Sequence, residues 1–207
     1  MQIIVNGEPW ALPSGVPLGG LDYRSLMEQV ALAMRDSGLL ITHVRVNGED
    51  VTGRDLNAID GLGKPQSLEL GVHRPEELVA ESLKVTAEMV APLRRDLATC
   101  ADQLRIGDEA TATLVLFRII DNFELLKSGV TQMGRILTRY LPGELAVVIT
   151  GFSGTFEPLL DEVISAQENR DLILLADLLE YELSEGLESW AVAIEPLIET
   201  LSKVTVE

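Results

Sequence analysis

Near its C-terminus the chain reads DLILLADLLEYELSEGLESWAVAIEPLIETL, from Asp171 to Leu201. Aliphatic residues recur in this stretch at steps of three and four, the spacing that places side chains on one face of a helix. Ile173, Leu174 and Leu178 widen the apolar arc beyond a single stripe. A helix with so wide an arc has to be covered on more than one side. The stretch therefore predicts a helix inside a bundle, or one that meets a second chain.

Two residues interrupt the stretch. Gly186 breaks the apolar pattern, and Pro196 removes a backbone donor, which predicts a bend or an end of the helix near Glu195. We therefore expect either two helices or one bent helix here.

Carboxylates follow the same helical steps on another face of this stretch. Asp177, Glu180 and Glu188 are the candidate partner-binding residues, since an acidic face attracts a basic protein. The alternative is a solvated acidic face that keeps an aliphatic bundle soluble. If these side chains are solvated, their replacement leaves folding intact.

The net charge of −17 is unevenly distributed, with fourteen of the 33 acidic side chains and only two of the 16 basic ones in residues 144–207. This charge repels nucleic acid and anionic membrane surfaces, so we expect neither as a partner. Hydrophobic residues nevertheless make up 46% of the chain, and the mean hydropathy is +0.20. That combination favours a homodimer in which aliphatic faces are hidden, with a basic or apolar protein as a further partner.

The single cysteine, Cys100, cannot form an internal disulfide, which fits a reducing compartment. Its place in an apolar stripe predicts a small buried side chain and not a reactive thiol. The opening residues MQIIVNGE contain no basic region followed by an apolar core, so we expect no signal peptide. No apolar run approaches the roughly 18 residues that a membrane span needs. We therefore expect a cytoplasmic protein, and its size and style suggest a bacterial one.

Residues 1–73 predict a small domain of strands around one helix. Alternating apolar residues indicate strands at 3–5, 41–46 and 67–72, and an amphipathic helix covers 21–37 with Leu26, Val30 and Met34 on one face. Two Asn-Gly pairs, in VNGE at Val5–Glu8 and again at Val46–Glu49, predict hairpin turns. This order of elements resembles the β-grasp, or ubiquitin-like, arrangement. Because the chain continues past this region, the resemblance implies an interaction or packing module, not a sulfur carrier or modifier with a free C-terminal Gly-Gly.

Residues 74–207 predict an acidic helical domain of four to six helices. From His73 onward, apolar side chains step by four and three like a coiled-coil seam, at Val79, Leu83, Thr86, Val90, Leu93, Leu97, Cys100 and Leu104. Pro92 predicts a bend in this helix, and Gly107 its end. Residues 110–140 carry a second broad apolar arc. The whole chain is thus predicted to be α+β, with domains at 1–73 and 74–207.

Among the patterns associated with catalysis, the strongest is Gly151-Phe152-Ser153-Gly154, which half resembles a nucleophile elbow. It follows Leu145–Ile149, a short strand or a buried helical turn. Both histidines, His43 and His73, precede the serine, whereas the elbow family places its histidine after it. The pattern instead predicts a flexible helix-capping turn, because Ser153 has no evident base.

Carboxylate pairs such as Asp177/Glu180 have the spacing of a di-metal bundle, but no Glu-x-x-His motif accompanies them. We therefore predict no catalytic residues, no cofactor and no metal. The leading hypothesis is a non-enzymatic interaction protein, an adaptor or chaperone-like factor. The alternative is a small-molecule-binding protein or enzyme with a site between the two domains.

Overall fold

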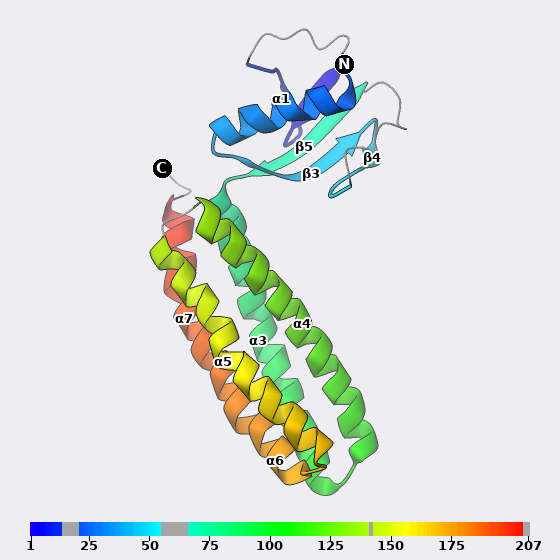
Figure 1. The fold of residues 1–207 in the computed structure, drawn as a ribbon, viewed down its shortest axis with the longest axis vertical. Coiled ribbons are helices and arrows are strands. Elements are labelled where there is room, and N and C mark those ends of the chain that lie inside the picture. The colour runs from blue at the N-terminus through cyan, green and yellow to red at the C-terminus, as the bar shows by residue number, and fades with distance from the viewer. Residues whose placement is uncertain (14–20, 55–65, 141–142, 205–207) are drawn as a thin grey trace. The chain divides into compact units, whose positions relative to one another are not determined.

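The computed structural model describes residues 1–13, 21–54, 66–140 and 143–204, and the chain divides into two compact units, Met1–Pro75 and Glu76–Glu207 (Figure 1). The first unit is a mixed sheet with one helix, and the second is helical. The α+β class predicted from the sequence is confirmed.

The N-terminal unit is a five-stranded sheet in the order β2-β1-β5-β3-β4, with helix α1 packed on it. The central strand β5 runs parallel to β1 and antiparallel to β3. Helix α1 turns Tyr23, Leu26, Val30 and Met34 into the core. The elements are β1 (Gln2–Val5), β2 (Glu8–Trp10), α1 (Tyr23–Asp36), β3 (Leu40–Val46), β4 (Glu49–Asp50) and β5 (Ser67–His73).

The two VNGE segments form the two hairpin turns, as predicted. Asn6 and Asn47 have positive φ angles of 50° and 52°, and the glycine after each has a φ of 84°. Asparagine and glycine tolerate this left-handed conformation better than other residues do. The Asn6 side chain bonds to the N–H and C=O of Val72, both at 2.9 Å. Asn47 Oδ1 accepts from the N–H groups of Gln66 and Ser67. Each turn therefore holds one end of β5.

The second unit is a four-helix bundle (Figure 1). Ion pairs join α3 to α4, α4 to α5, and α3 to the C-terminal helical rod, while Phe156 of α5 packs against the backbone of that rod at Gly186. Short connections after α3 and α5 reverse the chain, so successive helices are antiparallel. The elements are α3 (Pro75–Ile106), α4 (Glu109–Tyr140), α5 (Gly143–Glu168), α6 (Leu172–Asp177), the π-helical turn η2 (Leu178–Leu183) and α7 (Ser184–Val204).

The predicted seam of α3 is confirmed along its whole length. All eight of its positions, from Val79 to Leu104, are buried. The one polar member, Thr86, is satisfied because its hydroxyl donates to the carbonyl of Ser82 at 2.7 Å. The arc of α4 is buried in the same core.

Neither Pro92 nor Pro196 ends its helix, so the predicted alternative of a helix end near Glu195 is wrong: α7 continues to Val204. Both prolines are exposed, and so are Glu88 and Val192, whose carbonyls lose their helical donors. Water can bond those carbonyls, which lowers the cost of an interior proline.

The prediction of a capping turn at Gly151–Gly154 is also wrong, because these residues lie inside α5, and Leu145–Ile149 is helical as well. Two glycines in a helix cost about 1 kcal/mol each relative to alanine. Burial of Phe152 and Phe156, which are 2% and 1% exposed, outweighs that cost at roughly 1.5–3 kcal/mol per side chain.

The π-helical turn η2 was not predicted, although the sequence contains a signal for it. Leu179, Leu183 and Leu187 are separated by two successive steps of four, where a regular seam would alternate three and four. All three are buried. The extra residue is accommodated by the wider π turn, which keeps α6 and α7 facing the same core.

Three glycines give a test of this helical arrangement. A Cβ at Gly154 or Gly151 meets nothing within 4 Å, whereas a Cβ at Gly186 lies 3.2 Å from Cε1 of Phe156. We predict that Gly154→Ala raises the free energy of unfolding by about 0.5–1 kcal/mol. Gly186→Ala gains the same helix propensity but displaces the buried ring of Phe156. Its free energy of unfolding should therefore be lower than that of Gly154→Ala. Urea unfolding of the full chain, followed by circular dichroism, measures both. Equal effects would contradict the packing of Phe156 on α7.

Candidate interaction site

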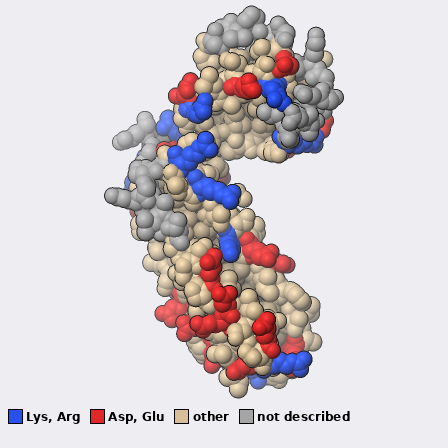
Figure 2. Space-filling view, viewed as in Figure 1, with Lys and Arg blue, Asp and Glu red and all other residues tan. Residues whose placement is uncertain are grey.

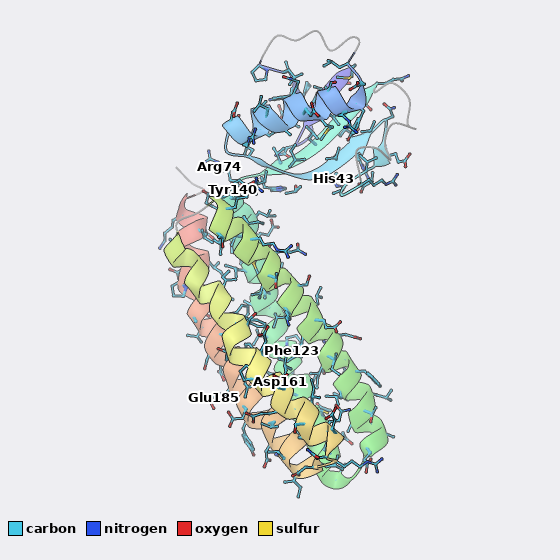
Figure 3. The ribbon with its side chains drawn as sticks, in the orientation of Figure 1. His43, Arg74, Phe123, Tyr140, Asp161 and Glu185 are labelled. Atoms are coloured by element: carbon cyan, nitrogen blue, oxygen red, sulfur yellow. The ribbon has the colours of Figure 1, made fainter. Side chains whose placement is uncertain are left out.

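An apolar groove runs between α4 and α5. Its cavity is about 310 Å³, and its lining extends from Leu116 to Lys127 of α4 and from Phe152 to Gln167 of α5, with Leu179 and Leu183 of η2. Aromatic rings line it, among them Phe123 of α4, which Figure 3 labels. Between ring centroids, Phe123 lies 5.7 Å from Phe156, and Phe152 lies 4.5 Å from Phe156. On the rim, Ile120 and Ile164 are 43% and 53% exposed.

Different side chains lie between α4 and α5 at different levels of their contact. At Gly134 of α4, an added Cβ would lie 3.8 Å from Cγ2 of Ile149 of α5, an ordinary van der Waals distance. Farther along, the ring of Phe123 of α4 packs against the ring of Phe156 of α5. Lys127 of α4 and Glu157 of α5 form an ion pair of 3.5 Å across the groove.

Two arginines of α3 hold the C-terminal helical rod on either side of the π turn. Arg105 donates to Asp177 at 2.8 Å and to Glu180, and its guanidinium lies 5.8 Å from the ring centroid of Tyr181. These hydrogen bonds raise the pKa of Arg105 above its ordinary value.

Eleven residues earlier on α3, Arg94 donates to Ser184 at 3.0 Å and pairs with Glu188 at 2.8 Å. The sequence predicts that its two basic clusters, Arg94-Arg95 and Arg135/Arg139, pair with the acidic C-terminal helices, and within the described residues the structure shows this for Arg94 alone. The four groups bonded to Arg94 and Arg105 belong to α6, η2 and α7. We call this set of contacts the arginine clasp.

All three candidate partner-binding residues belong to the arginine clasp. Asp177 and Glu188 keep side-chain exposures of 51% and 58%, and Glu180 is 31% exposed. Each carboxylate already has a cation from its own chain, a role that the sequence pattern did not reveal. A basic partner has to share these carboxylates with Arg94 and Arg105.

The residues considered for catalysis belong to different units of the chain. Ser153 is half-buried in α5 and lines the groove. His43 and His73 are both in the N-terminal unit, where Nδ1 of His43 lies 3.2 Å from Oγ1 of Thr52, and Nδ1 of His73 lies 3.0 Å from Oγ1 of Thr42. Both threonine hydroxyls also contact strand backbone, so these contacts connect strands and their edges.

Asp50 lies 3.9 Å from the same Nδ1 atom of His43 that contacts Thr52. A catalytic relay requires the base to use its two nitrogens for different partners. This threonine, histidine and aspartate therefore do not form a triad.

Within the described ranges, no group of three or more histidine, cysteine, aspartate or glutamate side chains is placed to hold a metal ion. No helix in the described part of the chain is both long enough and apolar enough to cross a membrane.

A family model described as a domain of unknown function, DUF8042, matches residues 81–193. The match extends from the second turn of α3 to the middle of α7, and so includes the groove and the arginine clasp. No curated protein and no solved structure matches the chain.

The arginine clasp predicts a salt-dependent contribution to stability. We expect Arg105→Gln to lower the urea midpoint of the full chain, because Asp177 and Glu180 lose their shared donor. The matched control is Arg95→Gln, which removes the same charge from an exposed position on the same helix. The difference between the variants should shrink in 1 M salt, where the screening length falls to roughly 3 Å. Equal midpoints at low salt would contradict the clasp.

Cys100 provides a separate test of the core. It is 0% exposed, its thiol donates to the carbonyl of Ala112 at 3.5 Å, and burial raises its pKa to about 11. We predict that a disulfide reagent at pH 8 modifies Cys100 only in denaturant, since the thiolate is the reacting form. The measurement is the release of the chromophore with time. Rapid modification of the native protein would contradict the burial.

Proposed function

The chain belongs to the DUF8042 family, and we propose that it is a non-enzymatic protein-interaction module, an adaptor or chaperone-like factor that acts as a homodimer in the bacterial cytoplasm. The observation that supports this proposal is the groove between α4 and α5. It offers partly exposed aliphatic side chains over an aromatic floor.

The groove suits an amphipathic helix of a partner protein. From Leu116 to Lys127, both of which line it, α4 rises by roughly 16 Å, which corresponds to about three helical turns. A helix lying in such a groove inserts side chains at positions i, i+3, i+4 and i+7. Each aliphatic side chain that becomes fully buried contributes roughly 1.5–3 kcal/mol before the cost of ordering is subtracted.

Charges at the rim indicate the polar face of the partner. Glu124 and Glu157 line the groove, and only Lys127 among the groove-lining residues is basic. Asp161 follows Glu157 by one helical turn of α5 (Figure 3). Basic residues flanking the apolar stripe of the partner complement this rim.

We further propose that the N-terminal unit is a β-grasp-like interaction or packing module. Its support is the strand order β2-β1-β5-β3-β4, with β1 and β5 parallel and α1 between β2 and β3 in the chain. The chain continues from β5 into α3 at Pro75. A carrier needs a free end after the last strand, so this continuation favours the interaction role.

A second candidate is a small-molecule-binding protein, and the size of the same groove favours it. A cavity of about 310 Å³ with aromatic walls falls at the lower end of the roughly 300–1,000 Å³ typical of ligand pockets. The ligand in that case is apolar and compact. We expect Ile120→Asp to weaken the binding of either a partner helix or a small molecule, because it places a charge on the apolar rim of the groove.

Photo-crosslinking inside the native host distinguishes these functions. We expect benzoylphenylalanine at position 164 of the full chain to give discrete adducts with another protein after irradiation. Adding Ile120→Asp should reduce those adducts at least tenfold. The matched control carries the probe at Val192 of α7, which is 60% exposed and does not line the groove.

Native mass spectrometry of the purified protein provides the second measurement. A bound mass of a few hundred daltons that disappears in Ile120→Asp would favour the small molecule. Adducts at position 164 no stronger than at position 192, without any bound mass, would contradict both functions. A urea midpoint for Ile120→Asp near that of the parent shows that the variant still folds.

A further inference from the structure

Helix α4 has a second apolar face, which points away from the bundle core. Leu114, Phe117 and Leu125 are 71%, 62% and 61% exposed. The opposite side of the same helix is fully buried between Ala112 and Leu137. A surface helix of a globular protein ordinarily has one apolar stripe and a polar outer side. Large exposed apolar side chains gathered on one helix mark an interaction surface.

These outward positions follow a heptad pattern. Steps of three and four connect a row of exposed residues along the whole helix, which we call the outer seam: Leu114, Phe117, Asp121, Glu124, Ser128, Thr131, Arg135 and Thr138. This is the spacing by which two helices pack lengthwise against each other. The outer seam is distinct from the groove lining except at Glu124.

Charges along the outer seam are separated by sign. Asp121 and Glu124 come before Ser128, and Arg135 comes after it, followed by Arg139 one turn later. On the side of the helical unit seen in Figure 2, most Lys and Arg gather toward the end where α4 finishes, and most Asp and Glu toward the opposite end.

The charged side chains on this side of α4 differ from several arginines of the bundle in having no ion-pair partner in the part of the chain that the structure describes. Within the described residues the structure gives Asp121, Glu124, Arg135 and Arg139 no ion-pair partner. By contrast, Arg94, Arg105 and Arg118 are each paired with a carboxylate of a neighbouring helix. These three arginines are therefore used inside the bundle, whereas charges of opposite sign without an ion-pair partner in the described ranges lie on either side of Ser128 on α4.

We propose that the outer seam is the interface of an antiparallel homodimer, with the two-fold axis passing beside Ser128. This inference rests on the proposed function only in naming a second copy as one partner of the module. A parallel pair of α4 helices would bring acids to acids and arginines to arginines. The antiparallel arrangement opposes them instead, and a two-fold axis makes each contact occur twice.

The register follows from distances along the helix. Asp121 and Arg135 both lie seven residues from Ser128, on opposite sides of it, so a two-fold axis there places each opposite the other in the second copy. Seven residues are two helical turns, about 10 Å, which keeps both side chains on the face of Ser128.

The same axis opposes two further pairs. Phe117 and Arg139 are each eleven residues from Ser128, which places a guanidinium over an aromatic ring in the manner of a cation–π contact. Glu124 and Gln132 are each four residues away and form a carboxylate–amide pair. No other residue of the outer seam gives this set of matched pairs, since an axis at Glu124 opposes Arg135 to Thr113 and an axis at Thr131 opposes it to Lys127, so neither opposes it to Asp121.

The net charge of −17 on each chain opposes association over long distances. At the interface, however, Asp121 and Arg135 balance each other in both copies. At physiological salt the screening length is roughly 8 Å, so charges far from the interface contribute little. Phe117 of the outer seam and Leu125 beside it, which are 62% and 61% exposed, supply the apolar contact, and the charges select the direction.

A charge exchange tests this interface. Light scattering on the full chain should give twice the 22.6 kDa mass for the parent, and a mass close to 22.6 kDa for Asp121→Arg and for Arg135→Asp at the same concentration. Mixing these two variants should restore the doubled mass as a heterodimer, because each contact then joins opposite charges. The chain carrying both changes should dimerise again. Arg95→Asp on α3 is the matched control for charge and should remain dimeric.

Disulfide trapping tests the position of the axis. Ser128→Cys should cross-link to its own copy under mild oxidation, whereas Thr138→Cys, about 15 Å from the axis along the helix, should not. Cys100 does not compete, because it is buried. Each variant has to match the urea midpoint of the parent.

A parent mass of 22.6 kDa would overturn the proposal, as would a dimer that keeps its mass in both charge variants. Neither result bears on the proposed function of the groove, because that function is tested by the photo-crosslinking adducts at position 164. Conversely, Ile120→Asp should retain the doubled mass even where it removes those adducts. If Ser128→Cys formed a mixed disulfide with a different protein and none with its own copy, the outer seam would be assigned to that protein.

Discussion

The helical unit depends on the burial of the seam of α3. Eight of its positions, from Val79 to Leu104, are buried, and they meet side chains from all three other helical segments in one core. Each such side chain contributes roughly 1.5–3 kcal/mol, whereas an exposed ion pair contributes about 0–1 kcal/mol. Aliphatic burial therefore decides that the bundle forms. The arginine clasp has a different role: because Arg94 and Arg105 reach specific groups on both sides of the π turn, it fixes the register of the C-terminal rod against α3.

Where the hydrophobic spacing is regular, the sequence predicted the structure well. The seam of α3, the arc of α4 and the amphipathic helix predicted at 21–37 all follow from local periodicity. The errors occur where a distant contact outweighs a local preference. Gly151 and Gly154 favour a turn by themselves, but the rings of Phe152 and Phe156 can be buried only if α5 is continuous. Likewise, no local rule places Arg105 beside Asp177, since these residues are 72 positions apart.

The groove could be predicted only in part. Ile120 and Ile164 belong to apolar arcs that are visible in the sequence, but periodicity does not tell whether the edge of an arc is covered. That depends on which side chains the neighbouring helix places opposite, here the rings of Phe123 and Phe156 at one level and Gly134 with Ile149 at another. In the N-terminal unit the opposite holds. The repeated VNGE motif predicted both hairpins, and the same asparagines that form the turns also bind β5, so one local signal determines a long-range contact.

A single constraint links the strong acidity of the chain to its apolar surface. Arginines facing the C-terminal rod are used inside the bundle, and this neutralises part of an acidic stretch that has no Lys or Arg of its own between Asp171 and Leu201. The remaining carboxylates keep the exposed aliphatic side chains from associating at random, because like charges repel wherever copies meet without register. This repulsion is offset on a face where acidic and basic side chains are arranged so that opposite charges meet across the contact. On α4, Asp121 and Arg135 provide such an order beside the exposed side chains of Phe117 and Leu125, which is the arrangement that the proposed contact between two copies requires.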